Sequence, residues 1–177
     1  MIRTVVSDKD THFVLGTLQQ QFNILVEYLY GSAFNKVDAA PTPTIGTEDK
    51  KTLTIASDVA VTLGGKDVTI PAATVDKAWT VGGNPLAPGM TRRYLLVADA
   101  TGAKSAIASD DQKEEADCMF SAGPGANAVA LSIATIKNES DAPFVPGETD
   151  LDAAGITITY ASPEGDAATF PVAKVVD

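Results

Sequence analysis

Apolar residues recur at a helical period in one stretch of the chain, Thr11 to Tyr30. Within it, apolar side chains are spaced alternately three and four residues apart, the pattern of the a and d positions in a coiled coil. These side chains are Leu15, Leu18, Phe22, Leu25 and Leu29. The opposite face is polar. The pattern predicts an amphipathic helix from about Asp10 to Tyr30, with Gly31 as its stop.

The apolar stripe of this helix needs a partner, which is either the chain's own β-domain or other copies of the helix. The stripe spans little more than two heptads, and an isolated helix of this length is marginal in water. The segment Ala39–Thr44, with Pro41 and Pro43, predicts an extended, semi-rigid linker that holds the helix away from the β-domain. The linker favours self-association, and the apolar flanks of the stripe favour three helices over two. We therefore expect a homotrimer.

From about Lys51 the apolar residues alternate with a period of two, which is typical of half-buried strands. Leu63-Gly64-Gly65-Lys66 is a two-residue hairpin signal. Further strands are expected at Ala78–Val81, Arg92–Asp99, Ala103–Ala108, Val129–Lys137, Gly155–Tyr160 and Thr169–Val175. The predicted fold is mainly β: an N-terminal amphipathic helix followed by a β-sandwich or jelly-roll-like domain. The predicted divisions are an arm and oligomerising helix at 1–38, a Pro/Thr linker at 39–50 and a β-domain at 51–177.

Composition narrows the classes of function. The 177-residue chain carries a net charge of −10, which argues against a nucleic-acid partner because phosphate contacts need clustered Lys and Arg. The adjacent basic pairs, Lys50-Lys51 and Arg92-Arg93, each lie next to a strand. Cys118 is the single cysteine, so an intrachain disulfide is excluded. The first ten residues do not read as a signal peptide, and no apolar run is long enough for a membrane helix, so we expect no membrane partner.

Candidate catalytic groups are few, and we expect no enzyme. The single histidine, His12, lies at the start of the predicted helix, so a His-dependent triad or a zinc site is not indicated. Gly123–Ala128 lacks the Lys-Ser/Thr of a phosphate loop and is expected to be a plain turn. Asp150 and Asp152 resemble the paired carboxylates of a glycosidase, but such pairs are common in turns. We therefore assign no catalytic, cofactor-binding or metal-binding residue, and no cofactor.

Three further features have two interpretations each. The acidic run 110–117 (DDQKEEAD) lacks the ligand spacing of a calcium loop, so a solvated turn or short helix is favoured over a cation site. Trp79 is either a stacking platform for a sugar or a core anchor, and the core anchor is favoured. Asn138-Glu139-Ser140 fits a glycosylation sequon, but without a secretory signal a polar turn is favoured.

Two stretches, RRYLLVADATGA and ALSIATIKNESDAPFVPGETDLDAAGITITY, resemble a pattern in virion proteins of tailed bacteriophages. The resemblance covers about residues 92–160. It rests on a strand ending in a polar turn, then FVPG, an Asp-rich turn and a GxTxTY strand. It implies a trimeric, β-rich structural protein of the virion, assembled in the bacterial cytoplasm, and it transfers no functional residues.

The resemblance leaves several functions open. The first is a capsid decoration or cement protein on the phage head, whose trimers contact the major capsid protein or another virion protein and oppose the pressure of packaged DNA. The second is a tail-fibre or baseplate component with a host-binding or adaptor-binding β-domain. The third, from another class, is a carbohydrate-binding module or hydrolase that uses Trp79 and nearby Tyr residues.

Overall fold

A computed structural model of the chain describes residues 35–72, 78–124 and 127–163. The predicted helix, with Leu15, Leu18, Phe22, Leu25 and Leu29, lies outside the described residues, as do His12 and the predicted strand Thr169–Val175. In the described part the chain is mainly β, as predicted: ten strands form three antiparallel sheets, accompanied by the 3-10 helix η2 (Glu115–Asp117). The described residues contain no helix long and apolar enough to cross a membrane.

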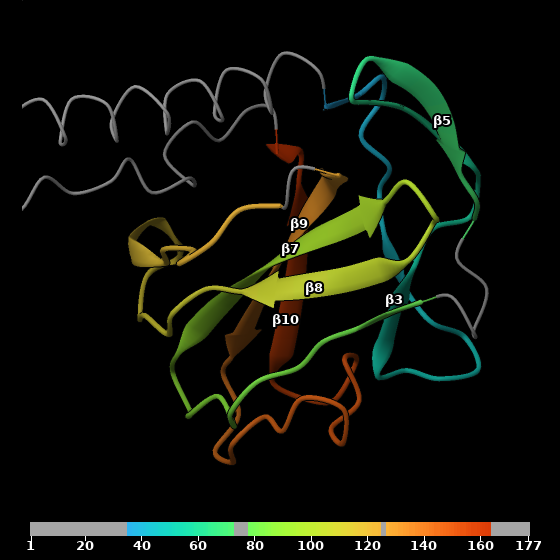
Figure 1. Cartoon of the computed structure of the whole chain (residues 1–177). Coiled ribbons are helices and arrows are strands. Elements are labelled where there is room, and N and C mark those ends of the chain that lie inside the picture. Colours follow the sequence, from blue (N-terminus) through green and yellow to red (C-terminus); the bar gives the residue numbers. More distant parts are fainter. Residues whose placement is uncertain (1–34, 73–77, 125–126, 164–177) are drawn as a thin grey trace, which may run out of the picture.

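The largest sheet, called here the main sheet, has four strands in the order β10-β9-β7-β8 (Figure 1). Their bounds are Thr91–Asp99 for β7, Lys104–Ala108 for β8, Ala128–Asn138 for β9 and Ile156–Ala161 for β10. These strands match the predicted ones to within about a residue or two at each end. A register shift between Leu96 and Val97 leaves Leu131 of β9 as an extra residue.

Two small sheets complete the domain. One has the order β1-β4-β5, with β1 at Lys36–Val37, β4 at Val59–Leu63 and β5 at Lys66–Ile70. The other has the order β2-β3-β6, with β2 at Thr44–Ile45, β3 at Thr52–Thr54 and β6 at Trp79–Thr80. The predicted hairpin is confirmed: Leu63 pairs with Lys66, and Gly64 and Gly65 both have positive φ at the turn.

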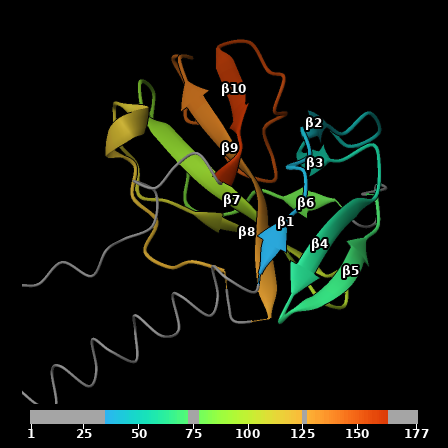
Figure 2. The same cartoon turned by 90° about the horizontal axis from the view of Figure 1, so that it is seen from above.

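The core lies between the main sheet and the two small sheets. Figure 2 shows the main sheet on one side of the domain and both small sheets on the other. It takes large side chains from all three sheets, including Leu53, Ile70, Trp79, Leu96 and Ile136. A second, smaller cluster lies on the other face of the main sheet, where Phe120 packs on Leu95, Val97, Ala130 and Ile133. The main sheet is therefore covered on both faces, and this explains why the first eight residues of β7 are all buried.

The start of the β-domain differs from the sequence prediction. β1 pairs with β4 and β2 pairs with β3, so residues assigned to the arm and the linker are hydrogen-bonded into the small sheets. Val37 belongs to the core, and Pro43 is buried. Part of the predicted Pro-Thr linker therefore packs against the domain: Thr44 and Ile45 form β2, and Pro43 is buried.

Candidate functional site

Two neighbouring arginines of β7 are the most unusual polar residues of the domain. Arg92 and Arg93 are both buried, although charged side chains are rarely buried without a partner. Successive side chains of a strand point to opposite faces. Arg92 therefore lies on the face that carries Tyr94 and the main core, and Arg93 lies on the face that carries Phe120. Each must find its partners on its own side of the main sheet.

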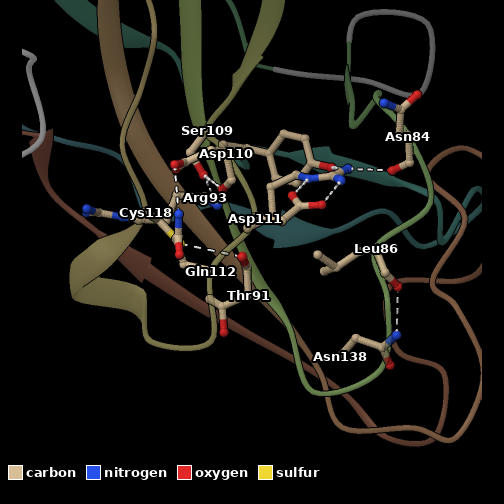
Figure 3. A network of polar contacts seen from close by, with 12 residues as sticks. Asn84, Leu86, Thr91, Arg93, Ser109, Asp110, Asp111, Gln112, Cys118 and Asn138 are labelled. Atoms are coloured by element: carbon tan, nitrogen blue, oxygen red, sulfur yellow. Dashed lines mark hydrogen bonds and ion pairs between the residues drawn. The ribbon is translucent and has the colours of Figure 1, made fainter.

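The guanidinium of Arg92 is bound on three sides. Its Nε donates to one oxygen of Asp111 at 2.5 Å, and its Nη2 donates to the other oxygen at 2.8 Å. Its Nη1 donates to the backbone oxygen of Asn84 at 2.7 Å and to the hydroxyl of Tyr94 at 3.3 Å. The Tyr94 hydroxyl in turn donates to the oxygen of Gly82 at 3.0 Å. Figure 3 labels Asp111 and Asn84, two of the residues that accept these hydrogen bonds.

The ionisation of these groups follows from their contacts. The hydrogen bonds to Asp111 raise the pKa of Arg92 above its ordinary value, so the guanidinium keeps its charge. Burial raises the pKa of Tyr94, which keeps the phenol protonated and able to donate to Gly82. The result is a charge-assisted, bidentate pair in which four of the five guanidinium N–H groups are hydrogen-bonded.

An open depression of about 330 Å³ lies beside this ion pair. Its lining residues come from the 82–84 turn, β7 and the segment after β8: Gly83, Asn84, Arg92, Ala108, Ser109, Asp110 and Asp111. The charged groups of the lining make internal contacts. Asp110 accepts the backbone N–H of Met119 at 2.6 Å and the side-chain amide of Gln112 at 2.9 Å. The geometry is that of a structural clamp, which fastens the acidic run to β7.

Arg93 fastens the same acidic run from the other face of the sheet. Its guanidinium lies 5.9 Å from the centre of the Phe120 ring, and its Nε lies 3.9 Å from a carboxylate oxygen of Glu115. Glu115 also accepts the hydroxyl of Thr135 at 2.8 Å. The predicted solvated turn or short helix is thus a 3-10 turn, η2, whose first residue is bound to the main sheet.

Backbone hydrogen bonds also hold the segment after β8 against β7, beside the two arginines. Thr91 and Gln112 exchange backbone hydrogen bonds of 2.6 and 3.0 Å, and Ser109 donates its N–H to the oxygen of Arg93 at 2.8 Å. The thiol of Cys118 is buried against the Thr91 oxygen at 3.4 Å. Burial raises the pKa of this thiol, which keeps it protonated and a poor nucleophile.

Asn138 organises the turn that leads from β9 to β10. It is fully buried, and its amide donates to the oxygens of Leu86 and Ala142, both at 2.9 Å. Its side-chain oxygen accepts the N–H and the hydroxyl of Ser140. Figure 3 shows the amide directed at the Leu86 oxygen. A buried amide with these four bonds is inaccessible to a glycosyl donor, so the polar-turn interpretation of the sequon is confirmed.

Trp79 is a core residue, as the favoured interpretation held. It is 1% exposed, and its indole N–H donates to the oxygen of Val97 at 2.9 Å. Lys104 lies over its ring, with Nζ 5.4 Å from the ring centre. Because both faces of the indole are enclosed, a sugar cannot stack on it. The Trp79-based carbohydrate site that the sequence left open is therefore wrong.

The remaining sequence candidates have other partners or lie outside the described residues. Lys50 binds Asp152 at 2.6 Å, so this carboxylate of the Asp150–Asp152 pair has a surface partner. In the described ranges, no group of three or more His, Cys, Asp or Glu side chains is placed to hold a metal ion. The seam residues Leu15, Leu18, Phe22, Leu25 and Leu29 are not among the described residues, and their oligomerising role stays a prediction.

The two arginine clamps and the burial of the Asn138 side chain are the features that sequence reasoning missed. The sequence did contain a signal for the two arginine clamps. Two arginines stand directly before the apolar run Tyr94–Ala98 of a predicted strand, and buried charges require partners. The acidic run that comes after it supplies them. Searches against protein-family models, curated proteins and solved structures found no match.

Proposed function

We propose that this chain is a structural protein of a bacteriophage virion, a capsid decoration or cement protein that acts as a trimer through non-catalytic contacts. We propose for the whole chain an N-terminal amphipathic helix followed by a β-sandwich or jelly-roll-like domain. Its partners are two further copies of itself and the major capsid protein or another virion protein. Its place is the surface of the phage head.

The observation that carries this proposal is the unity of the segment that resembles virion proteins. Residues 92–160 supply nearly the whole main sheet, β7 to β10, and the connections between its strands. The FVPG motif begins at Phe144, which is 1% exposed and forms a bridge with Leu86. The Asp-rich turn carries Leu151 into the core. The residues of the resemblance thus build one continuous structural unit.

The contacts of this unit suit a mechanical role. Ion pairs and hydrogen bonds fasten the connections to both faces of the main sheet, through Arg92, Arg93 and Asn138. A rigid domain that is bound across the junctions of a shell can oppose outward pressure by burying its surface against the shell.

The trimeric seam is supported by where the chain enters the β-domain. Asn35 bonds the backbone of Ala128 at 3.2 Å and that of Gly64 at 2.8 Å, so the chain is fixed six residues after Leu29. The core of the described domain already takes large, fully buried apolar side chains from all three sheets. In this proposal the helical stripe therefore pairs with its own copies, because the core of the domain is already filled.

Location on the particle tests the function. The purified protein is mixed with empty capsids and, separately, with isolated tails, and each mixture is sedimented. Cosedimentation with capsids, and gold-labelled protein on heads in electron micrographs, is the expected result. Binding to tails alone would replace the proposal with the tail-fibre or baseplate alternative. Binding to neither particle would contradict both.

The seam is tested with a matched pair of variants. Leu18→Asp with Leu25→Asp places charges in the apolar stripe, whereas Gln20→Asp with Asn23→Asp places the same charges on the polar face. Light scattering is expected to give about 55 kDa for the wild type and the control, three times the 18.3 kDa chain, and a monomer for the seam variant. A wild-type monomer, or a folded trimer of the seam variant, would contradict the proposed seam.

A further inference from the structure

The acidic segment after β8 forms a loop that is closed on itself. Ser109 and Phe120 form an antiparallel bridge at its base, and both are buried. Next to the base, Asp110 donates its N–H to the oxygen of Met119 at 3.1 Å, and its carboxylate accepts the Met119 N–H at 2.6 Å. Residues 110–119, called here the acidic loop, therefore begin and end at the same place, as in the compact surface loops that often carry a function.

The acidic loop contributes almost nothing to the apolar core. Of its residues, Cys118 alone is buried, and η2 within it contains no buried residue. Neither of the two core clusters includes a residue of the loop, and its one large apolar side chain, Met119, is 45% exposed. A segment with so few buried apolar contacts can open locally at a smaller free-energy cost than global unfolding.

The contacts that hold the acidic loop on the sheet are polar and concentrate at the start of β7. Asp111 binds the guanidinium of Arg92 through both carboxylate oxygens. Thr91 exchanges backbone hydrogen bonds with Gln112, and its oxygen accepts the thiol of Cys118 at 3.4 Å (Figure 3). Because these contacts lie close together, the loss of one weakens the hold on the whole loop.

The main sheet does not depend on the acidic loop. β7 pairs with β9 from Thr91 to Asp99 and with β8 from Tyr94 to Ala98. Phe120, which packs on the outer face of the sheet, belongs to the base and not to the loop. Lifting residues 110–119 therefore breaks polar contacts but leaves the strand ladder and both core clusters in place.

We propose that the acidic loop opens from the main sheet as a unit, hinged at the bridge between Ser109 and Phe120, while the sheet stays folded. The pair of Arg92 and Asp111 is its latch, because this pair is charge-assisted and bidentate and opening must break it. Opening carries the Cys118 thiol from its buried place into solvent. The domain thereby has a closed and an open form, which differ in whether the acidic side chains are held on the sheet.

The reactivity of Cys118 in the full-length protein tests this. Cys118 is the single cysteine of the chain, so its reaction with the thiol reagent DTNB reports only on this loop. The wild type is expected to react much more slowly than the urea-unfolded chain. Its rate should hardly change with urea below the unfolding transition, because local opening exposes little surface, whereas global unfolding exposes much.

Two destabilising variants separate local from global opening. Asp111→Asn removes the counter-charge of the latch and is expected to speed labelling of Cys118 about tenfold or more. Gly155→Ala strains the turn before β10, which stays folded when the loop opens, so it should leave the labelling rate unchanged. Asp117→Asn changes an exposed carboxylate of the same loop and is the matched control, with the wild-type rate expected.

Several results would overturn the proposal. A labelling rate that rises with urea as steeply as unfolding itself would mean that the thiol is reached only by global unfolding. Equal acceleration by Gly155→Ala and Asp111→Asn would mean the same. A wild-type rate in Asp111→Asn would contradict the latch. A wild-type protein that reacts as fast as the unfolded chain would contradict the closed form. If Asp111→Asn does not fold, the urea series on the wild type still decides between local and global opening.

Discussion

Arg92 and Asp111 illustrate what a single buried pair does in this domain. The Arg92 side chain is 4% exposed and the Asp111 side chain is 34% exposed, so the pair lies at the border of the core. Removing two charges from water is costly, and the bidentate geometry offsets that cost. Such a pair adds little net stability compared with apolar residues, but it fixes the position of the segment that carries Asp111. Removing one partner should therefore lower the free energy of unfolding more than replacing both partners with apolar residues.

Asp111→Asn should show this cost. The variant keeps the shape of the side chain but leaves a buried guanidinium without its counter-charge. Water reaches the exposed part of Asp111, so we expect a loss of about 2 kcal/mol in the free energy of unfolding, less than for a fully enclosed pair. Urea denaturation measures it. Asp117→Asn, an exposed carboxylate of the same acidic run, is the control; equal losses in the two variants would contradict the clamp.

Asp99 predicts how stability depends on pH. Its carboxylate accepts the hydroxyl of Thr101 at 2.6 Å and the N–H groups of Thr101 and Ala103, and these bonds lower its pKa below the ordinary value of 3.8. A lowered folded-state pKa means that the stabilisation is complete above pH 3.8 and is lost as the pH falls through the folded-state pKa.

We expect Asp99→Asn to flatten the acid limb of the stability curve below pH 3.8 and to leave its slope at neutral pH unchanged. Thermal unfolding at a series of pH values measures the curve, and an NMR titration of the Asp99 side chain gives its pKa directly. An unaltered acid limb in the variant, or a normal pKa in the wild type, would refute the assignment.

At the scale of elements, two of the turns that connect strands depend on glycine for different reasons. The β4–β5 turn is open to solvent: nothing lies within 4 Å of a Cβ placed on Gly64. The turn before β10 is closed. Gly155 has a φ of 80°, and a Cβ on it would lie 2.8 Å from the Cα of Ser140. The same residue type is thus needed for backbone conformation alone in one turn and for conformation and space in the other.

Replacing each of these two glycines with alanine separates the requirement for a positive φ from the requirement for space. Gly64→Ala should cost about 1 kcal/mol of unfolding free energy, the strain of a positive φ alone. Gly155→Ala should cost about 3 kcal/mol, because the added methyl also displaces the Asn138–Ser140 turn. Chemical denaturation of both variants checks the difference. Similar losses at the two sites would mean that Ser140 moves aside without cost.

At the scale of the whole molecule, the β-domain encloses its own core. The main sheet is covered by two small sheets on one face and by the 109–120 segment on the other. The proposed trimer seam then lies in a different part of the chain from the packing that folds the domain. Association and folding should respond to different substitutions, because the two sets of apolar residues do not overlap.

The fluorescence of the single tryptophan can test whether folding of the β-domain is independent of association. Trp79 is enclosed in the core, so its emission maximum follows the packing of the β-domain. We expect Leu18→Asp with Leu25→Asp to leave that maximum unchanged and to shift the thermal midpoint by less than about 4 °C. The Gln20→Asp with Asn23→Asp variant is the reference. A red-shifted emission in the seam variant would mean that the helical stripe covers the β-domain instead.

The sequence by itself determined the mainly β class and most of the strand positions, because alternation with a period of two is a local property of the chain. It also determined the Gly64-Gly65 hairpin, since a two-residue turn of this kind needs positive φ. The core role of Trp79 was favoured for the same sort of reason: a large apolar side chain is usually buried.

Only the tertiary structure decided which strands pair, and this depends on contacts far apart in the chain. It showed that Thr44 and Ile45 of the Pro-Thr segment pair with β3, because these residues find their partners only once β3 is in place. It paired Arg92 with Asp111 and enclosed Asn138 with Leu86, 52 residues away. Polar residues have no periodic signature that names their partners, so their roles emerge only when the fold brings them together.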